Sequence, residues 1–174
     1  MNPERAGWLE PTEYYASLPS FLAGAAALIT DPRGRVLLVK PNYRDHWNLP
    51  GGVLDGAESP DVACAREIRE ELGLALVVGA LLVVDWVAPT DIRRAWFGFV
   101  FDAGTLAGPE AITLQEEELD GYEFVAPTEA YSRLTANTAD RLRAALDAQA
   151  TGRTVNLVNG KPVLPPAGPT PTSR

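Results

Sequence analysis

Residues 52–74 read GVLDGAESPDVACAREIREELGL, and this stretch decides the fold. Its later part contains residues that are typical of the start and the end of a helix. Ser59 can serve as the N-cap, and Pro60 suits the first helical position, where a missing N–H costs no hydrogen bond. Gly73 suits the left-handed position that follows a helix end. The sequence therefore predicts a helix over residues 60–72, about three and a half turns long.

One face of this helix is acidic. At 100° per residue, Glu67, Glu70 and Glu71 fall within about 100° of one another. Like charges at this spacing destabilise a helix unless neighbouring arginines or a bound cation neutralise them. Carboxylate oxygens are the ligands that Mg²⁺ and Mn²⁺ prefer. The helix alone favours a solvated acidic face, since charge runs usually face solvent, and a metal-binding face is the alternative.

The surrounding sequence distinguishes these two interpretations. Gly52 is followed by Glu58 after five residues, and after seven more comes the run REIREELGL at residues 66–74. This spacing resembles the signature of the Nudix family at every specified position. Residues 47–51, WNLPG, also resemble the family's usual lead-in. We call residues 52–74 the box.

The resemblance implies an α/β fold, the Nudix-type α/β/α sandwich with a mixed β-sheet, and Mg²⁺ or Mn²⁺ as cofactor. Carried over by motif position, Glu67, Glu70 and Glu71 would be catalytic metal ligands. Glu58 would be an auxiliary ligand or an orienting group, and Arg66 would hold the carboxylates by ion pairing. The metal in this family promotes the attack of water on a phosphoric anhydride.

The general base has several candidates. Glu67 or Glu70 would act through a metal-bound water. In some family members a glutamate of a later loop serves instead, and residues 116–118 form such an acidic run, within which we take Glu117 as the candidate. A solvated loop is the alternative for this run.

Substrate contacts are expected beside the box. Gly51 and Gly52 would let the backbone approach the substrate. Lys40 and Arg44 flank this glycine loop and are candidates to contact a phosphate, with ordinary surface positions as the alternative.

The rest of the chain predicts alternating strands and helices. An arm over residues 1–20, which includes a short helix opened by Pro11, precedes a Nudix domain over 21–164 and a disordered proline-rich tail over 165–174. Strands are expected at residues 21–29 and 35–40, paired as a hairpin, and at 74–87, 95–101 and 122–125. Helices are expected from Pro127 and over 139–148, with a last strand or hairpin within 154–164.

Composition excludes several classes of function. A net charge of −8 argues against a duplex nucleic-acid partner. A single cysteine, Cys64, rules out an intrachain disulfide and a cysteine-based zinc cluster. The sequence shows no apolar run long enough for a membrane span and no signal peptide, so no membrane partner and a cytoplasmic location are expected. A homodimer is compatible with the sequence.

We therefore expect a hydrolase that cleaves the pyrophosphate bond of a nucleoside diphosphate linked to another moiety, a small-molecule nucleotide. Pro89 lies 15 residues after Leu74, a feature associated in the family with ADP-ribose pyrophosphatases, while nucleoside triphosphates stay open. One alternative is a catalytically silent domain that senses a nucleotide. Another is isomerase chemistry, which in this fold uses a reactive cysteine outside the box, whereas Cys64 lies inside it.

Overall fold

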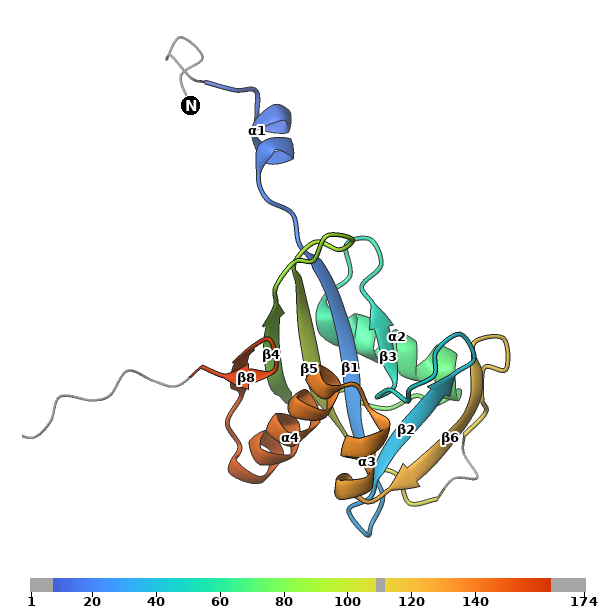
Figure 1. Ribbon diagram of the computed structural model, residues 1–174. Coiled ribbons are helices and arrows are strands. Elements are labelled where there is room, and N and C mark those ends of the chain that lie inside the picture. The colour runs from blue at the N-terminus through green and yellow to red at the C-terminus, as the bar shows by residue number, and fades with distance from the viewer. Residues whose placement is uncertain (1–7, 109–111, 164–174) are drawn as a thin grey trace, which may run out of the picture.

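The computed structural model describes residues 8–108 and 112–163 (Figure 1). Its centre is a mixed sheet in the order β6-β2-β1-β5-β4-β7-β8, with β3 paired to β1. The strands are β1 Leu22–Thr30, β2 Val36–Pro41, β3 Gly51–Val53, β4 Leu81–Val87, β5 Trp96–Thr105, β6 Leu119–Val125, β7 Val155–Val158 and β8 Lys161–Pro162. The helices are α1 Pro11–Ser17, α2 Pro60–Leu72, α3 Pro127–Arg133 and α4 Ala136–Thr151.

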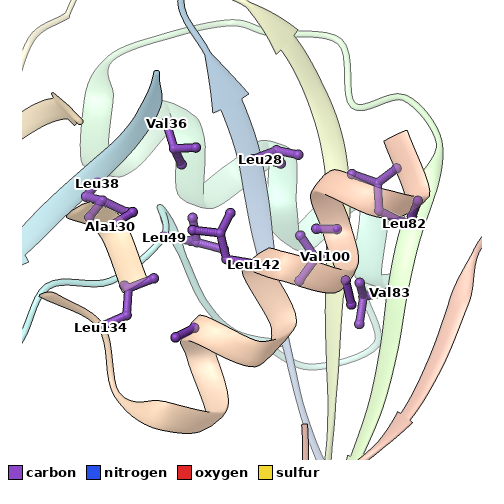
Figure 2. Packing of buried hydrophobic residues seen from close by; sticks show 14 of the residues in the cluster. Leu28, Val36, Leu38, Leu49, Leu82, Val83, Val100, Ala130, Leu134 and Leu142 are labelled. Atoms are coloured by element: carbon purple, nitrogen blue, oxygen red, sulfur yellow. The ribbon is translucent and has the colours of Figure 1, made fainter. Parts of the chain in front are cut away.

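Helices cover both faces of the sheet, which confirms the predicted sandwich. On one face, Ile68 and Leu72 of α2 pack into a fully buried cluster with strand residues such as Leu37. On the other face, α3 and α4 form a second cluster, and Figure 2 shows Leu142 of α4 directed toward the sheet that carries Leu28. The sheet is therefore buried between two apolar layers, as the near-continuous apolar runs of its central strands β1 and β2 require.

The predicted hairpin of the first two strands is correct only at its turn. Thr30 pairs with Val36, after which β2 leaves β1 and pairs along its length with β6. The freed edge of β1 is taken by the glycine loop, which was expected to be irregular and instead forms β3. On its other edge β1 runs parallel to β5. Because β1 and β2 diverge, the glycine loop can pair with β1 as strand β3, next to the centre of the sheet.

Helix α2 begins and ends where the sequence predicts. Ser59 occupies the N-cap position with extended backbone, although its side chain makes no capping hydrogen bond. Gly73 follows the helix with φ of 67°, the left-handed conformation that favours glycine. The backbone of Thr113 closes around this end, since its N–H donates to the carbonyl of Leu72 over 2.9 Å.

The predicted strand over 74–87 is wrong in its first half. No strand is assigned to residues 74–80 in the structure, and β4 begins at Leu81. Leu74 and Leu76 do alternate inward against the α2 cluster, while Val77 points to solvent. The period-two pattern therefore reports burial correctly, but the segment lacks a neighbouring strand with which to form a ladder.

The elements expected in the C-terminal part of the chain are present, and the long helix is longer than expected. Helix α4 runs three residues further at each end than expected, from the N-cap Thr135 to Gly152 with φ of 67°. The expected last element is the β7–β8 hairpin, and the predicted tail at 165–174 lies outside the described residues. Helix α1 buries no residue and stands away from the sheet in Figure 1. No described helix is long and apolar enough to cross a membrane.

Candidate active site

The last turn of α2 is tied to the glycine loop by Glu71. Its Oε2 accepts a hydrogen bond of 2.8 Å from the backbone N–H of Gly51. Gly51 has φ of 142°, and a Cβ there would lie 2.2 Å from the carbonyl oxygen of Ala25 on β1. Glycine is required at this position because any side chain would collide with the neighbouring strand. The resulting close packing holds the buried Glu71 against β3, next to the central strand β1.

Gly52 makes room for a second carboxylate. A Cβ on Gly52 would lie 2.3 Å from Oε1 of Glu67, which no real structure tolerates. Glu67 is half-buried and lies one helical turn from Glu71 on the same face of α2. The two glycines of β3 therefore bring backbone, rather than side chains, up against the two carboxylates of the helix.

Arg66 connects the other carboxylates. Its Nη2 lies 2.7 Å from Oε1 of Glu58, and its Nη1 lies 2.9 Å from Glu67 and 2.8 Å from Glu70. The same guanidinium donates to the carbonyl of Val53 over 3.2 Å. The arrangement matches the role that the box implies for Arg66, since one cation orients three anions. One positive charge does not neutralise them.

The electrostatics of these groups differ with their surroundings. Burial raises the pKa of Glu71 to about 8, and the carboxylates of Glu67, Glu118 and Glu70 add to the rise. Burial also raises the pKa of Glu67, against the opposing pull of Arg66. The hydrogen bonds from Arg66 lower the pKa of Glu58. Negative charge is therefore concentrated beyond what the protein's own cations balance.

These carboxylates fit a divalent cation by their chemistry. Among residues 8–108 and 112–163, no three acidic, histidine or cysteine side chains converge into a ready metal-binding group. Arg66 occupies oxygens of Glu58, Glu67 and Glu70, and Gly51 occupies one of Glu71. The donor set is nonetheless oxygen-only and excessively negative, which is what Mg²⁺ or Mn²⁺ requires. Metal binding would exchange contacts with Arg66 for contacts with the cation.

A cleft of about 650 Å³ opens beside these groups. Gly51, Gly52, Glu67 and Glu71 line it, and so does Arg44, whose guanidinium lies over the ring of Tyr43. Five of the predicted site residues do not line the cleft: Glu58, Arg66 and Glu70, which form the ion-pair cluster described above, and Lys40 and Glu117. The ammonium of Lys40 bonds to the carbonyls of Pro41 and Arg44, and it does not line the cleft.

Glu117, the sequence-based candidate for the general base, also lies apart from the cleft. Its backbone carbonyl accepts a hydrogen bond of 2.8 Å from Nδ2 of Asn42, and its exposed side chain is absent from the lining. The next residue, Glu118, lines the cleft and is close enough to raise the pKa of both Glu67 and Glu71. Of the acidic run, Glu118 is therefore the carboxylate that faces the site.

The cleft also contains a cluster of charged side chains around a tryptophan, which the sequence analysis did not predict. Arg93 and Arg141 both lie over the ring of Trp96, with 5.8 and 5.3 Å from guanidinium carbon to ring centroid, and all three residues line the cleft. Asp85 pairs with Arg141 and is completely buried. The sequence does indicate such a pair, because the single carboxylate within the apolar run LLVVDWV requires a partner of opposite charge when it is buried.

Comparison with known proteins is decisive for the family. The sequence model of the NUDIX domain matches residues 20–146. The chain belongs to the NUDIX family. A MutT-like protein of Streptomyces ambofaciens is 30% identical over 149 residues, which cover 86% of this chain and 91% of that protein. A putative 8-oxo-dGTP diphosphatase of Bacillus subtilis is 36% identical over 109 residues, 62% of this chain and 68% of that protein.

Solved structures agree with this assignment. The MutT protein of Methanosarcina mazei Go1 matches with a TM-score of 0.64 at 26% identity, over 76% of this chain and 99% of that one. The prediction of a NUDIX enzyme acting on phosphoric anhydrides is thereby confirmed. The isomerase alternative gains nothing from the structure, because Cys64 is fully buried and burial raises its pKa to about 12.

Proposed function

We propose that this NUDIX chain is a metal-dependent hydrolase that cleaves a pyrophosphate bond in a nucleotide. The observation that carries the proposal is the placement of Glu67 and Glu71 on the wall of a 650 Å³ cleft, directly behind the backbone of Gly51 and Gly52. A cleft of this volume accommodates a nucleotide. The silent-sensor alternative is disfavoured because every acidic position of the box keeps its carboxylate.

Glu58, Glu67, Glu70 and Glu71 would hold Mg²⁺ or Mn²⁺. When bound, such a cation neutralises phosphate charge and lowers the pKa of coordinated water. The chain's own contribution is to gather the carboxylates before the cation binds: Arg66 contacts three of them, and the backbone of Gly51 contacts the fourth. Glycine backbone at β3 lets the diphosphate approach without steric hindrance.

Glu118 is our proposal for the general base. It lies in the loop before β6, is exposed at the cleft, and is not engaged by Arg66. Among residues 8–108 and 112–163 its carboxylate makes no hydrogen bond or ion pair, so it is available to accept the proton of the attacking water in the aqueous cleft. Glu117 was the candidate from sequence, and the lining of the cleft favours its neighbour.

Nucleoside triphosphates, including oxidised ones, are the substrate class that we place first. The 36%-identical Bacillus subtilis relative is named for 8-oxo-dGTP, which is the support for this order. The position of Pro89 supports ADP-ribose-like compounds as the second class. A cytoplasmic location and a homodimer stay predictions from the sequence.

The test is a panel of substrates with product analysis. Purified protein is incubated with Mg²⁺ and nucleoside triphosphates, 8-oxo-dGTP, dinucleoside polyphosphates, ADP-ribose or nucleotide sugars, and products are separated by chromatography. Glu70→Gln serves as the blank. Turnover of one class by the wild type, lost in the variant, supports the proposal. Nucleotide binding without turnover of any compound would instead establish the sensor.

A further inference from the structure

The buried ion pair between Asp85 and Arg141 holds a guanidinium at the wall of the cleft. Nε of Arg141 donates to Oδ2 of Asp85 over 2.8 Å, and the Asp85 side chain has no exposed surface. Oδ1 of the same carboxylate accepts a hydrogen bond of 3.0 Å from the backbone N–H of Gly160, in the turn between β7 and β8. Both oxygens of Asp85 are therefore satisfied, and the C-terminal hairpin takes part in fixing Arg141.

The terminal nitrogens of Arg141 are left available. In the described part of the chain they donate to no acceptor, although the arginine side chain is only 13% exposed. The guanidinium lies over the Trp96 ring and against the floor formed by Gly98, where a Cβ would come within 3.5 Å of Nη1. A desolvated guanidinium with unused donors is costly unless an acceptor meets it. Solvent or a ligand in the cleft is the remaining source of such an acceptor.

The position of this group relative to the box suits an elongated ligand. Gly52 pairs with Ala25 on β1, and the adjacent Gly24 pairs with Gly98 on β5, above which Arg141 lies. Strands β3 and β5 flank β1, so they lie about 10 Å apart across the sheet. A nucleoside attached to a diphosphate extends over such a distance. One cleft thus joins a carboxylate cluster at β3 to a guanidinium at β5.

We propose that Arg141 is a specificity-determining residue, which donates hydrogen bonds to an oxygen acceptor on the part of the substrate remote from the box, and that Asp85 is its positioning residue. The proposal rests on the proposed function. The acceptor is a carbonyl oxygen of a base or an oxygen of a terminal phosphate, because a planar guanidinium fork suits both. The guanidinium groups of Arg93 and Arg141 already lie over the Trp96 ring. We therefore assign this ring to contacts with the arginines and not to stacking on a base.

The experiment measures equilibrium binding of nucleotides to the Glu70→Gln variant, which should hydrolyse them too slowly to disturb the titration. Glu70→Gln protein with Mg²⁺ is titrated by calorimetry with GTP, ATP and ribose 5-triphosphate, with and without Arg141→Gln. We expect Arg141→Gln to weaken the preferred nucleotide about tenfold or more. A loss for GTP alone places the acceptor on the base, and an equal loss for ribose 5-triphosphate places it on a phosphate.

The matched control is Arg143→Gln on the same helix. Arg143 is exposed, pairs with Asp140 and lies outside the cleft lining, so its removal should leave affinity within about twofold. Asp85→Asn tests the positioning role: it should raise KM with little change in kcat. In the double variant with Arg141→Gln it should add no further loss of affinity. Circular dichroism checks that each variant is folded, and Arg141→Gln decides the matter if Asp85→Asn does not fold.

The possible results separate the two proposals. Turnover by the wild type together with unchanged affinity in Arg141→Gln overturns the specificity role and leaves the hydrolase intact. Binding that depends on Arg141 without turnover of any compound overturns the hydrolase and leaves the specificity role standing. Absence of both binding and turnover overturns both.

Discussion

The carboxylate of Glu71 and the backbone N–H of Gly51 are joined by a hydrogen bond of 2.8 Å across 20 residues of sequence. The bond fixes the last turn of α2 against β3, and β3 in turn is fixed against β1 by three paired residues. The carboxylates of the helix therefore move with the centre of the sheet.

Substitution of Gly52 by alanine should impair activity without unfolding the chain. The new Cβ would lie 2.3 Å from Oε1 of Glu67, so that carboxylate must swing away. A displacement of about 1 Å costs roughly 100-fold in rate. The measurement is kcat of Gly52→Ala against Gly121→Ala, where a Cβ meets no atom within 4 Å. Equal kcat in the two variants would show that the position of Glu67 is unimportant.

Stability without metal should fall as the pH rises from about 5 to 8. Glu71 has a pKa of about 8 in the folded chain and an ordinary value of 4.5 when exposed, so between these values the folded state binds the extra proton. That stabilisation is complete below pH 4.5 and is lost as the pH passes 8. Urea unfolding in EDTA at several pH values measures the slope.

Glu71→Gln is the control for this pH dependence. The amide keeps an oxygen that can accept from Gly51 but does not titrate. The lowered pKa values of Glu58 and Asp31 act in a more acidic range, so they do not produce the slope between pH 5 and 8. A slope that is the same in wild type and Glu71→Gln would contradict the assignment to Glu71.

Loss of Arg66 should destabilise the chain more in EDTA than in Mg²⁺. The residue contacts Glu58, Glu67 and Glu70, which would repel one another in Arg66→Ala. A bound divalent cation supplies the missing positive charge. The measurement is the change in Tm on adding Mg²⁺, expected to be larger in the variant than in the wild type. An identical change would mean that Arg66 and the cation do not share ligands.

Glu118→Gln should reduce kcat much more than Glu117→Gln. Glu118 lines the cleft and acts on the pKa of Glu67 and Glu71, whereas the side chain of Glu117 lies outside the lining. Removal of a general base costs about 100-fold or more. The comparison is made at saturating substrate, so that kcat rather than binding is compared. A larger loss in Glu117→Gln would return the assignment to that residue.

The box illustrates what sequence can predict. The bounds of α2 followed from Pro60 and Gly73, because local punctuation determines where a helix begins and ends. The grouping of Glu67, Glu70 and Glu71 followed from helical periodicity and from the family resemblance. These features depend on neighbours within one or two turns, and such neighbours are visible in the sequence.

Features that depend on distant partners were missed. Residues 74–80 have the alternation of a strand but lack a ladder partner, and β3 is short and glycine-rich but has one in β1. Strand pairing is a long-range property, and propensity reports it poorly. The Asp85–Arg141 pair spans 56 residues, so the charged residue in β4 was visible while its partner was not.

The central claim is that the box glutamates support metal-dependent cleavage of a pyrophosphate bond. Its most direct test is the turnover of the best substrate of the panel by wild type, Glu67→Gln and Glu70→Gln, each in Mg²⁺ and in EDTA, with all proteins shown to be folded. The account predicts turnover only in the wild type with Mg²⁺, and a loss of at least about 100-fold in both variants. Near-wild-type turnover in both variants, or full activity in EDTA, would contradict it.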